Sequence, residues 1–158
     1  MLRIGHSYDI HRLEENQELI LAGVKIDAPF GTVAHSDGDV LVHVVIESII
    51  GALGLGDIGA LFPDTDPKYK DISSMLLLEE VVKIMKSHNF RVNNIDCSIY
   101  LETPKLRTYI ESMRLNLAQV LEVEVNQINI KATRGERLGF IGRSEGIASE
   151  AVVLLTND

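Results

Sequence analysis

The most apolar stretch of the chain, residues 40–55, constrains the fold more than any other feature. Ionisable side chains interrupt it only at His43 and Glu47. It is shorter than the roughly 20 apolar residues that a membrane-spanning helix needs. Asp39, immediately before it, belongs to the residue types that cap helix N-termini. We therefore expect a buried helix over residues 40–54.

Strand-like and helix-like segments alternate along the rest of the chain. Alternating apolar residues predict strands at 2–9, 18–24, 91–102, 127–133 and 147–155, and helical spacing predicts further helices at 73–87 and 105–121. Polar or Gly-, Pro- and Asp-rich composition predicts loops at 12–17, 54–67 and 134–144. This order favours an α/β fold of the α+β sandwich type, with one sheet covered by helices on one face. Because the 158 residues contain no repeat and no linker, we expect one domain spanning residues 1–158.

Charge and cysteine content limit the function classes. The chain has 15 Lys and Arg against 23 Asp and Glu, a formal net charge of −8. That balance argues against nucleic acid and against an anionic membrane surface as the main partner. Cys97 is the only cysteine, so no intramolecular disulfide can form and a reducing compartment is expected. The first residues show no signal- or transit-peptide pattern, so we expect a cytoplasmic protein, bacterial in preference to a mature plastid one.

A first candidate site combines Asp9, His11 and His43. Residues two apart on a strand point to the same face, so Asp9 and His11 can converge on one ion. An imidazole has no hydrophobic reason to lie in the apolar segment around His43, which makes it the best third ligand. Three protein ligands with an open fourth position are usual for catalytic zinc. The alternative is a surface carboxylate beside a partly buried histidine, with His43 as a hydrogen-bonded core residue.

Two loops next to this region carry further candidate residues. In the segment 35–39, backbone amides and the helix N-terminus can hold a phosphate, with His35 and Ser36 as side-chain partners. Simple helix capping explains the same residues. In the segment 56–66, carboxylates flank Thr65 and suit sugar or polyol hydroxyls, although turn formation accounts for them equally.

The segment 131–143 is the fourth candidate. It contains three arginines, one lysine, one threonine and three glycines at a strand end, a composition that suits an anion. Glu136 within it can hold a hard divalent cation. A solvated charged hairpin is the competing interpretation. The fingerprints of serine hydrolases, P-loop proteins and dinucleotide-binding proteins do not occur in the sequence.

Five segments, residues 4–11, 34–39, 56–59, 61–66 and 138–148, occur in an order and at a spacing that resemble the 2-C-methyl-D-erythritol 2,4-cyclodiphosphate synthase family. The resemblance covers essentially the whole chain. It implies cyclisation of 4-diphosphocytidyl-2-C-methyl-D-erythritol 2-phosphate with release of CMP, in non-mevalonate isoprenoid precursor biosynthesis. It also implies a homotrimer with active sites at the subunit interfaces.

The resemblance also implies the metal ions and the catalytic residues. Zinc lies on Asp9, His11 and His43, in agreement with the spacing argument, and a second divalent ion, Mg²⁺ or Mn²⁺, lies on the diphosphate with Glu136 as its ligand. The implied catalytic residues are His35, Thr133 and Arg134. The family commonly has a second threonine at the position of Arg134, and a guanidinium binds negative charge more strongly but with different geometry.

Residues that match the family's substrate-binding positions come from all parts of the chain. Phosphate and methylerythritol contacts match the 35–36 and 62–66 segments, the cytidine pocket matches 101–107, and Phe140 and Arg143 match residues at or near the trimer's central cavity. The full set is Asp9, His11, His35, Ser36, Asp57, Ile58, Gly59, Phe62, Pro63, Asp64, Thr65, Asp66, Leu101, Pro104, Lys105, Arg107, Thr133, Arg134, Gly135, Glu136, Phe140 and Arg143.

Two other functions compete with the synthase. A zinc-dependent phosphohydrolase would use the same three metal ligands to make a bound hydroxide and would release inorganic phosphate. A metal-stabilised binding or assembly domain would use the apolar segment 147–155 to form an oligomer and would turn nothing over.

Overall fold

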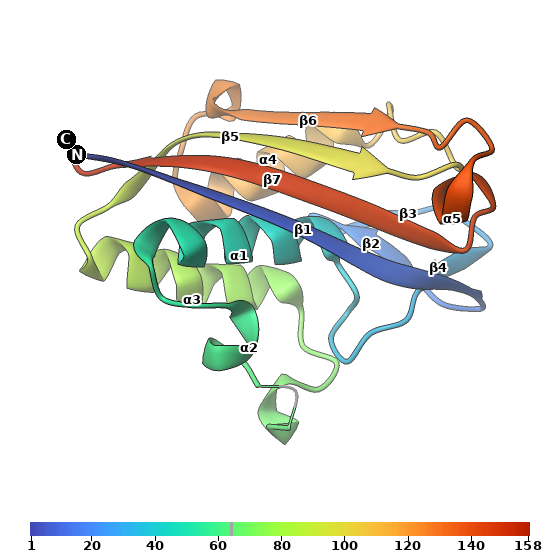
Figure 1. Cartoon of the computed structure of the whole chain (residues 1–158), viewed down its shortest axis with the longest axis horizontal. Helices are drawn as coiled ribbons and strands as arrows, with labels where there is room; N and C mark the ends of the chain where they lie inside the picture. Colours follow the sequence, from blue (N-terminus) through green and yellow to red (C-terminus); the bar gives the residue numbers. More distant parts are fainter. Residues whose placement is uncertain (64) are drawn as a thin grey trace.

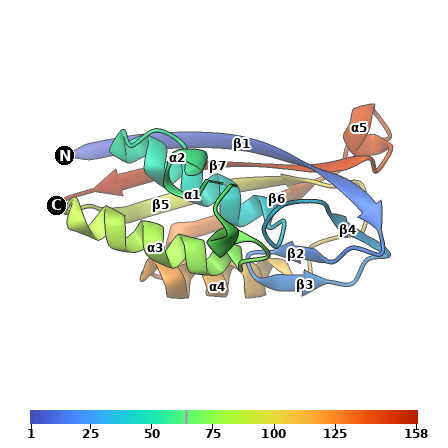
Figure 2. The same cartoon turned by 90° about the horizontal axis from the view of Figure 1, so that it is seen from below.

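A mixed five-stranded sheet with helices on one face forms the frame of the protein (Figures 1 and 2). The computed structural model describes residues 1–63 and 65–158. The strands follow the spatial order β4 (Phe30–Thr32), β1 (Leu2–Glu15), β7 (Gly146–Thr156), β5 (Arg91–Tyr100) and β6 (Ile128–Thr133). Every neighbouring pair is antiparallel except β5 and β6, which are parallel. This arrangement confirms the α+β prediction of one sheet with helices packed on it.

The helix α1 (Val40–Leu53) is the centre of the core and confirms the predicted buried helix. All its Val, Leu, Ile and Ala residues are buried, and the Asp39 carboxylate accepts a hydrogen bond from the Val42 amide at 3.0 Å. It contacts β1 and β7, and α3 (Ser74–Ser87) packs beside it. A third helix, α4 (Ile110–Leu121), covers β6. Within the part of the chain that the structure describes, no helix combines the length and the apolarity that crossing a membrane would need.

Several short elements lie outside this core. The remaining elements are β2 (Leu19–Leu21), β3 (Val24–Ile26), α2 (Ile58–Leu61), α5 (Gly139–Gly142) and the 3₁₀ turns η1 (Pro67–Tyr69) and η2 (Val125–Gln127). The two chain ends meet at one end of the sheet, where the Met1 amino group donates to Asn157 Oδ1 at 2.6 Å (Figure 1).

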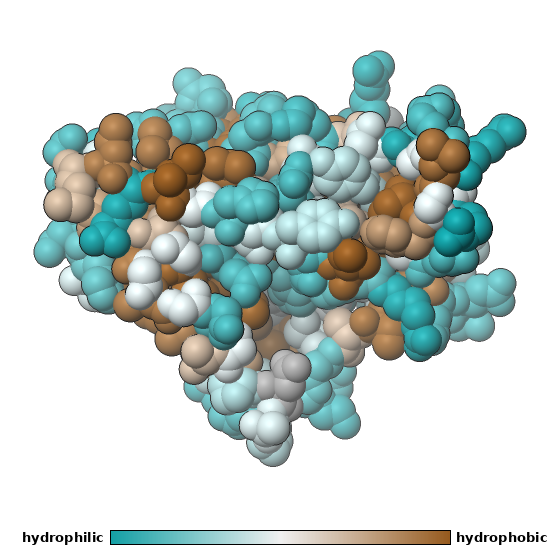
Figure 3. Space-filling model, viewed as in Figure 1, coloured by the Kyte–Doolittle hydropathy of each residue, from teal (hydrophilic) through white to brown (hydrophobic). Residues whose placement is uncertain are grey.

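The two faces of β1 differ because alternate residues point in opposite directions. Its odd-numbered residues from Gly5 to Leu13 face α1 and are buried or half-buried, whereas Ile4, Tyr8 and Ile10 are exposed on the other face. Figure 3 shows the face of the molecule seen in Figure 1, and the surface over the strands there is a mixture of apolar and polar side chains. The alternation therefore directs Asp9 and His11 toward the helices.

Several predicted boundaries are wrong. Residues 12–15 are not loop but the end of β1, because residues 13–15 pair with β4. Residues 18–24 are not one strand but most of the β2–β3 hairpin, which turns at Ala22 and Gly23 with φ of 48° and 71°. The helix expected from residue 105 starts at Ile110, because a turn closed by the Tyr109 amide and the Leu106 carbonyl precedes it. The predicted loops 54–67 and 134–144 contain α2, the start of η1, and α5.

Gly5 provides a test of the close packing between β1 and α1. A Cβ atom at this position would lie 1.8 Å from the Ser48 carbonyl oxygen. Gly5→Ala should therefore lower the free energy of unfolding by about 1–3 kcal/mol, measured by urea denaturation. Gly51→Ala is the matched control, since a Cβ there meets nothing within 4 Å, and in a helix it should stabilise by roughly 0.5–1 kcal/mol. Equal free energies for the Gly5 variant and the wild type would contradict this packing.

Candidate metal centre and active site

Three side chains converge between β1 and the first turns of α1. The distances are 3.0 Å from His11 Nε2 to Asp9 Oδ2, 3.5 Å from His43 Nδ1 to Asp9 Oδ2, and 3.4 Å from His43 Nδ1 to His11 Nε2. Ligands at zinc's usual bond lengths in a tetrahedron lie about 3.3 Å apart. The triangle therefore fits a zinc-sized ion, and it confirms the grouping of Asp9, His11 and His43 as a candidate metal site.

The packing of β1 on α1 explains why these three residues meet. Asp9 and His11 follow the inward-facing Ser7 on the same face of the strand, and the Ser7 hydroxyl donates to Glu47 Oε2 at 2.9 Å. His43 lies four residues before Glu47, on the same side of α1. Because the strand and the helix run past one another, the next inward positions of β1 reach His43.

The environment of Asp9 and His11 favours their charged forms. Burial raises the pKa of the Asp9 carboxyl, but hydrogen bonds and charges from His11 and His43 outweigh it and hold this pKa below its ordinary value. Burial lowers the pKa of His11, but its contacts with Asp9 and the Gly38 carbonyl outweigh that effect and raise the pKa. The His11 Nδ1 atom lies 3.0 Å from the Gly38 oxygen, so Nδ1–H donates there and Nε2 points to the triangle.

A pocket of about 320 Å³ opens beside the candidate metal site. It is lined by residues of several predicted segments together with three that the sequence did not suggest, Val33, Tyr69 and Leu77. The predicted residues that line it are His11, His35, Ser36, His43, Ile58, Gly59 and Phe62. Phe62 packs edge-on against Tyr69, with ring centroids 5.4 Å apart. The loop after α1 thus forms one wall of this pocket.

The other residues predicted in this loop have local contacts. Asp57 caps α2, accepting from the Ala60 amide at 2.9 Å, and Asp66 caps η1 through the Lys68 amide at 2.9 Å. Pro63 and Thr65 are exposed. Asp64 lies outside the described residues. The turn-forming explanation holds for Asp57 and Asp66 in this chain, and binding roles for these residues stay predictions.

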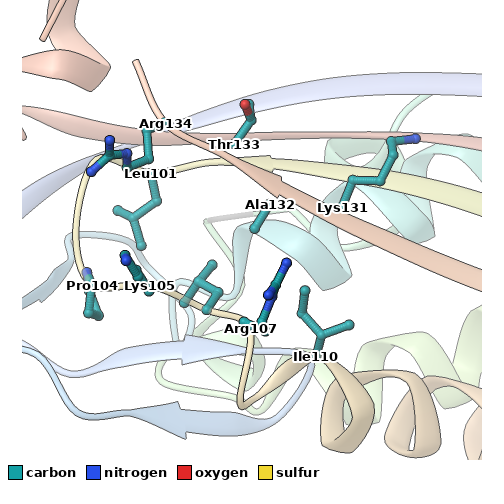
Figure 4. Close-up of a pocket in the computed structure, with 10 residues that line it drawn as sticks. Leu101, Pro104, Lys105, Arg107, Ile110, Lys131, Ala132, Thr133 and Arg134 are labelled. Carbon is teal, nitrogen blue, oxygen red and sulfur yellow. The ribbon is translucent and has the colours of Figure 1, made fainter. Parts of the chain in front are cut away.

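A second pocket, of about 620 Å³, lies at the far edge of the sheet, between the end of β6 and the start of α4 (Figure 4). It brings together the predicted Leu101, Pro104, Lys105, Arg107, Thr133 and Arg134, and adds Leu106, Ile110, Lys131 and Ala132. Three of these side chains, Lys105, Arg107 and Arg134, supply positive charge, although the whole chain has a net charge of −8; the ammonium of the fourth cationic residue, Lys131, is paired with Asp96. Figure 4 shows Ala132 pointing into the pocket and the Thr133 hydroxyl on the opposite side of β6. The pocket suits an anion.

The loop between β6 and β7 carries the remaining predicted residues. Gly135 donates its amide to Glu102 Oε2 at 2.8 Å, and Glu136 is exposed with φ 51°. Within the described part of this single chain, Glu136 does not join the Asp9–His11–His43 group. Phe140 lies in α5 against Gly146, and Arg143 makes a two-pronged ion pair with Glu145 at 2.8 and 3.1 Å. Their predicted binding roles stay predictions.

The His43→Ala variant tests the metal centre. Its zinc affinity should fall by more than roughly 100-fold, since losing a ligand costs more than the 10- to 100-fold of an outer contact. The far-UV circular dichroism should remain that of the wild type. His88→Ala, which alters an exposed histidine at the end of α3, should bind zinc as the wild type does. Undiminished zinc binding by His43→Ala, measured by chelator competition, would overturn the ligand assignment.

The chain is similar to known proteins over nearly its whole length. A family model described as the YgbB family matches residues 2–156. A 2-C-methyl-D-erythritol 2,4-cyclodiphosphate synthase from Actinobacillus succinogenes is 51% identical over 155 residues, which cover 98% of each chain.

Two solved structures have the same fold. The bifunctional IspDF from Campylobacter jejuni is 44% identical with a TM-score of 0.94, and the match covers 98% of this chain but only 42% of that longer one. The IspF of Plasmodium falciparum, solved as a CDP complex, is 34% identical with a TM-score of 0.85, covering 98% of this chain and 95% of that one. These matches confirm the resemblance seen in the sequence, and the chain belongs to the YgbB family, the family of the 2-C-methyl-D-erythritol 2,4-cyclodiphosphate synthases.

Proposed function

We propose that the chain is a 2-C-methyl-D-erythritol 2,4-cyclodiphosphate synthase. It cyclises 4-diphosphocytidyl-2-C-methyl-D-erythritol 2-phosphate and releases CMP, a step of non-mevalonate isoprenoid biosynthesis. The observation that carries the proposal is the metal-sized triangle of Asp9, His11 and His43, in a chain 51% identical to a synthase of that name. The CDP complex of a relative supports a cytidine-diphosphate-linked substrate.

The reaction is a phosphoryl transfer within one molecule. An oxygen of the 2-phosphate forms a bond to the β-phosphorus, the bond from that phosphorus to the bridging oxygen breaks, and CMP leaves with the electron pair. A zinc ion on the triangle and a Mg²⁺ or Mn²⁺ ion on Glu136 supply, when bound, the positive charge that stabilises this transition state. His35, Thr133 and Arg134 act on the reacting phosphates.

The substrate is held at both ends by the two pockets. His35 and Ser36 lie beside the metal ligands and donate hydrogen bonds to the phosphate and the methylerythritol. Lys105, Arg107 and Arg134 surround the second pocket and bind the cytidine diphosphate. Phe62 and its neighbours in the loop after α1 enclose the methylerythritol.

The active form is a homotrimer in which each active site is shared by two subunits. In a single chain two of the metal ligands, Asp9 and His11, lie on β1, and the cationic pocket lies at the end of β6, with β7 and β5 between these strands. Three steps of strand spacing separate these strands by about 14 Å. A neighbouring copy that brings its cationic pocket to the metal site of the first would join the two halves. A cytoplasmic location stays part of the proposal, and the relative from Actinobacillus succinogenes supports a bacterial source.

Product analysis tests the reaction. Zinc-loaded protein with Mg²⁺ and the diphosphocytidyl substrate should release one CMP per turnover, and phosphorus NMR should show a cyclic diphosphate. Inorganic phosphate with no cyclic product would favour the zinc phosphohydrolase. Binding without turnover would favour a binding or assembly domain. Either of those results would refute the proposed synthase.

A complementation experiment tests the shared sites. His43→Ala inactivates the metal half, and Lys105→Glu with Arg107→Glu inactivates the cationic half. In a cyclic trimer that contains both kinds of chain, one of the three interfaces joins two intact halves. Mixed trimers, isolated through two different tags, should therefore have about one third of the wild-type activity.

The controls are trimers of each variant alone, which should be inactive. Native mass spectrometry of the same samples establishes the number of subunits. Mixed assemblies with no activity would show that each site is completed within one chain or by different residues.

A further inference from the structure

His43 has a second, buried set of partners behind the metal triangle. Its Nδ1 atom faces Asp9 and His11, whereas its Nε2 atom lies 2.9 Å from Ser74 Oγ and 3.1 Å from Ser36 Oγ. Ser74 is fully buried at the start of α3, and the imidazole is only 14% exposed. This arrangement leaves the ring little room to rotate.

The hydroxyl of Ser74 is held by Asp37. Ser74 Oγ lies 2.5 Å from Asp37 Oδ1, and the Ser74 amide donates to Asp37 Oδ2 at 2.9 Å. A carboxylate only accepts hydrogen bonds, and a serine hydroxyl has one proton to donate. Ser74 therefore donates that proton to Asp37 and presents a lone pair to His43.

The direction of this chain of hydrogen bonds decides the tautomer of His43. Because Ser74 can only accept from the ring, Nε2 carries the proton. The lone pair of the neutral imidazole then lies on Nδ1, which is the atom in the metal triangle. If Ser74 instead donated to Nε2, the proton would lie on Nδ1 and would block metal binding.

We propose that Asp37 and Ser74 are positioning residues, which fix the ring orientation and the tautomer of His43 so that Nδ1 can bind the metal. Neither residue belongs to the group of candidate metal ligands. Both act through His43, Ser74 by direct contact and Asp37 by holding Ser74. Outer partners of this kind orient metal ligands and raise metal affinity. The inference rests on the metal site of the proposed function and holds whichever reaction the site catalyses.

Backbone contacts hold Asp37 and Ser74 in place. The Asp39 amide donates to Asp37 Oδ1 at 3.1 Å, the Asp37 amide donates to the Ile72 carbonyl at 3.2 Å, and the Asp71 amide donates to the His35 carbonyl at 2.9 Å. These bonds join the loop before α1 to the residues before α3. The two residues are therefore fastened independently of the metal and can preorganise the site before an ion binds.

Zinc affinity and the cobalt spectrum test the proposal. Ser74→Ala should bind zinc about 10- to 100-fold more weakly in chelator competition, and should alter the visible absorption of the Co²⁺-substituted protein. Ser74→Thr, which retains the hydroxyl, should restore both. Ser73→Ala is the matched control, because the neighbouring Ser73 is exposed and makes no side-chain capping hydrogen bond. Equal zinc affinity of Ser74→Ala and the wild type would overturn the proposal.

A direct observation of the tautomer needs no metal. In metal-free wild-type protein, long-range proton–nitrogen NMR should show a proton on His43 Nε2, the atom 2.9 Å from Ser74 Oγ. Asp37→Ala frees the Ser74 proton and should shift the ring toward the Nδ1–H form. A wild-type ring with no proton on Nε2 would refute the proposal even if the Ser74 variants fail to fold. Absence of CMP release, with these tautomer and affinity results intact, would count against the proposed reaction alone.

Discussion

Burial of α1 beneath β1 and β7 is the packing constraint on which both the fold and the metal site depend. Gly5 approaches the α1 backbone so closely that no side chain fits, and Ser7 bonds to Glu47 one step further along. Gly5 and Ser7, two successive inward-facing residues of β1, thus fix the position of the strand along the helix. The next inward-facing residues of β1 are Asp9 and His11, and His43 lies one helical turn from Glu47. The packing of β1 on α1 in the core therefore also places the candidate metal ligands.

The sequence predicts those parts of the structure that follow from local periodicity. The apolar stretch around His43 became the buried helix, and the spacing of Asp9 and His11 became a shared strand face. The convergence of His43 with Asp9 and His11 was predictable because an ionisable ring in an apolar helix needs a polar partner. Asp9 and His11, two suitable ligands on one strand face, could provide it. The role of each motif in substrate binding followed only from the family resemblance.

Long-range contacts account for what the sequence could not predict. The extension of β1 depends on pairing with β4, which local patterns do not encode. Asp37 looked like a capping residue, and its contact with Ser74 spans 37 positions of the chain. The cationic pocket draws its residues from the segment before α4 and from the end of β6, which α4 and η2 separate along the chain. The order of the strands in the sheet sets its distance from Asp9 and His11. Such contacts depend on the order and pairing of the strands, which the alternation of apolar and polar residues in the sequence does not determine.

The meeting of the two chain ends has a consequence for the evolution of longer proteins. Met1 bonds to Asn157 at the opposite end of the sheet from α5, so both ends leave the domain at one place (Figure 1). Another folded unit attached there would disturb neither the core nor the pockets, because neighbouring termini at a surface tolerate insertion and fusion. The domain can therefore serve as a module within a multi-enzyme polypeptide, and the bifunctional chain from Campylobacter jejuni, of which it covers 42%, has the length for such an arrangement.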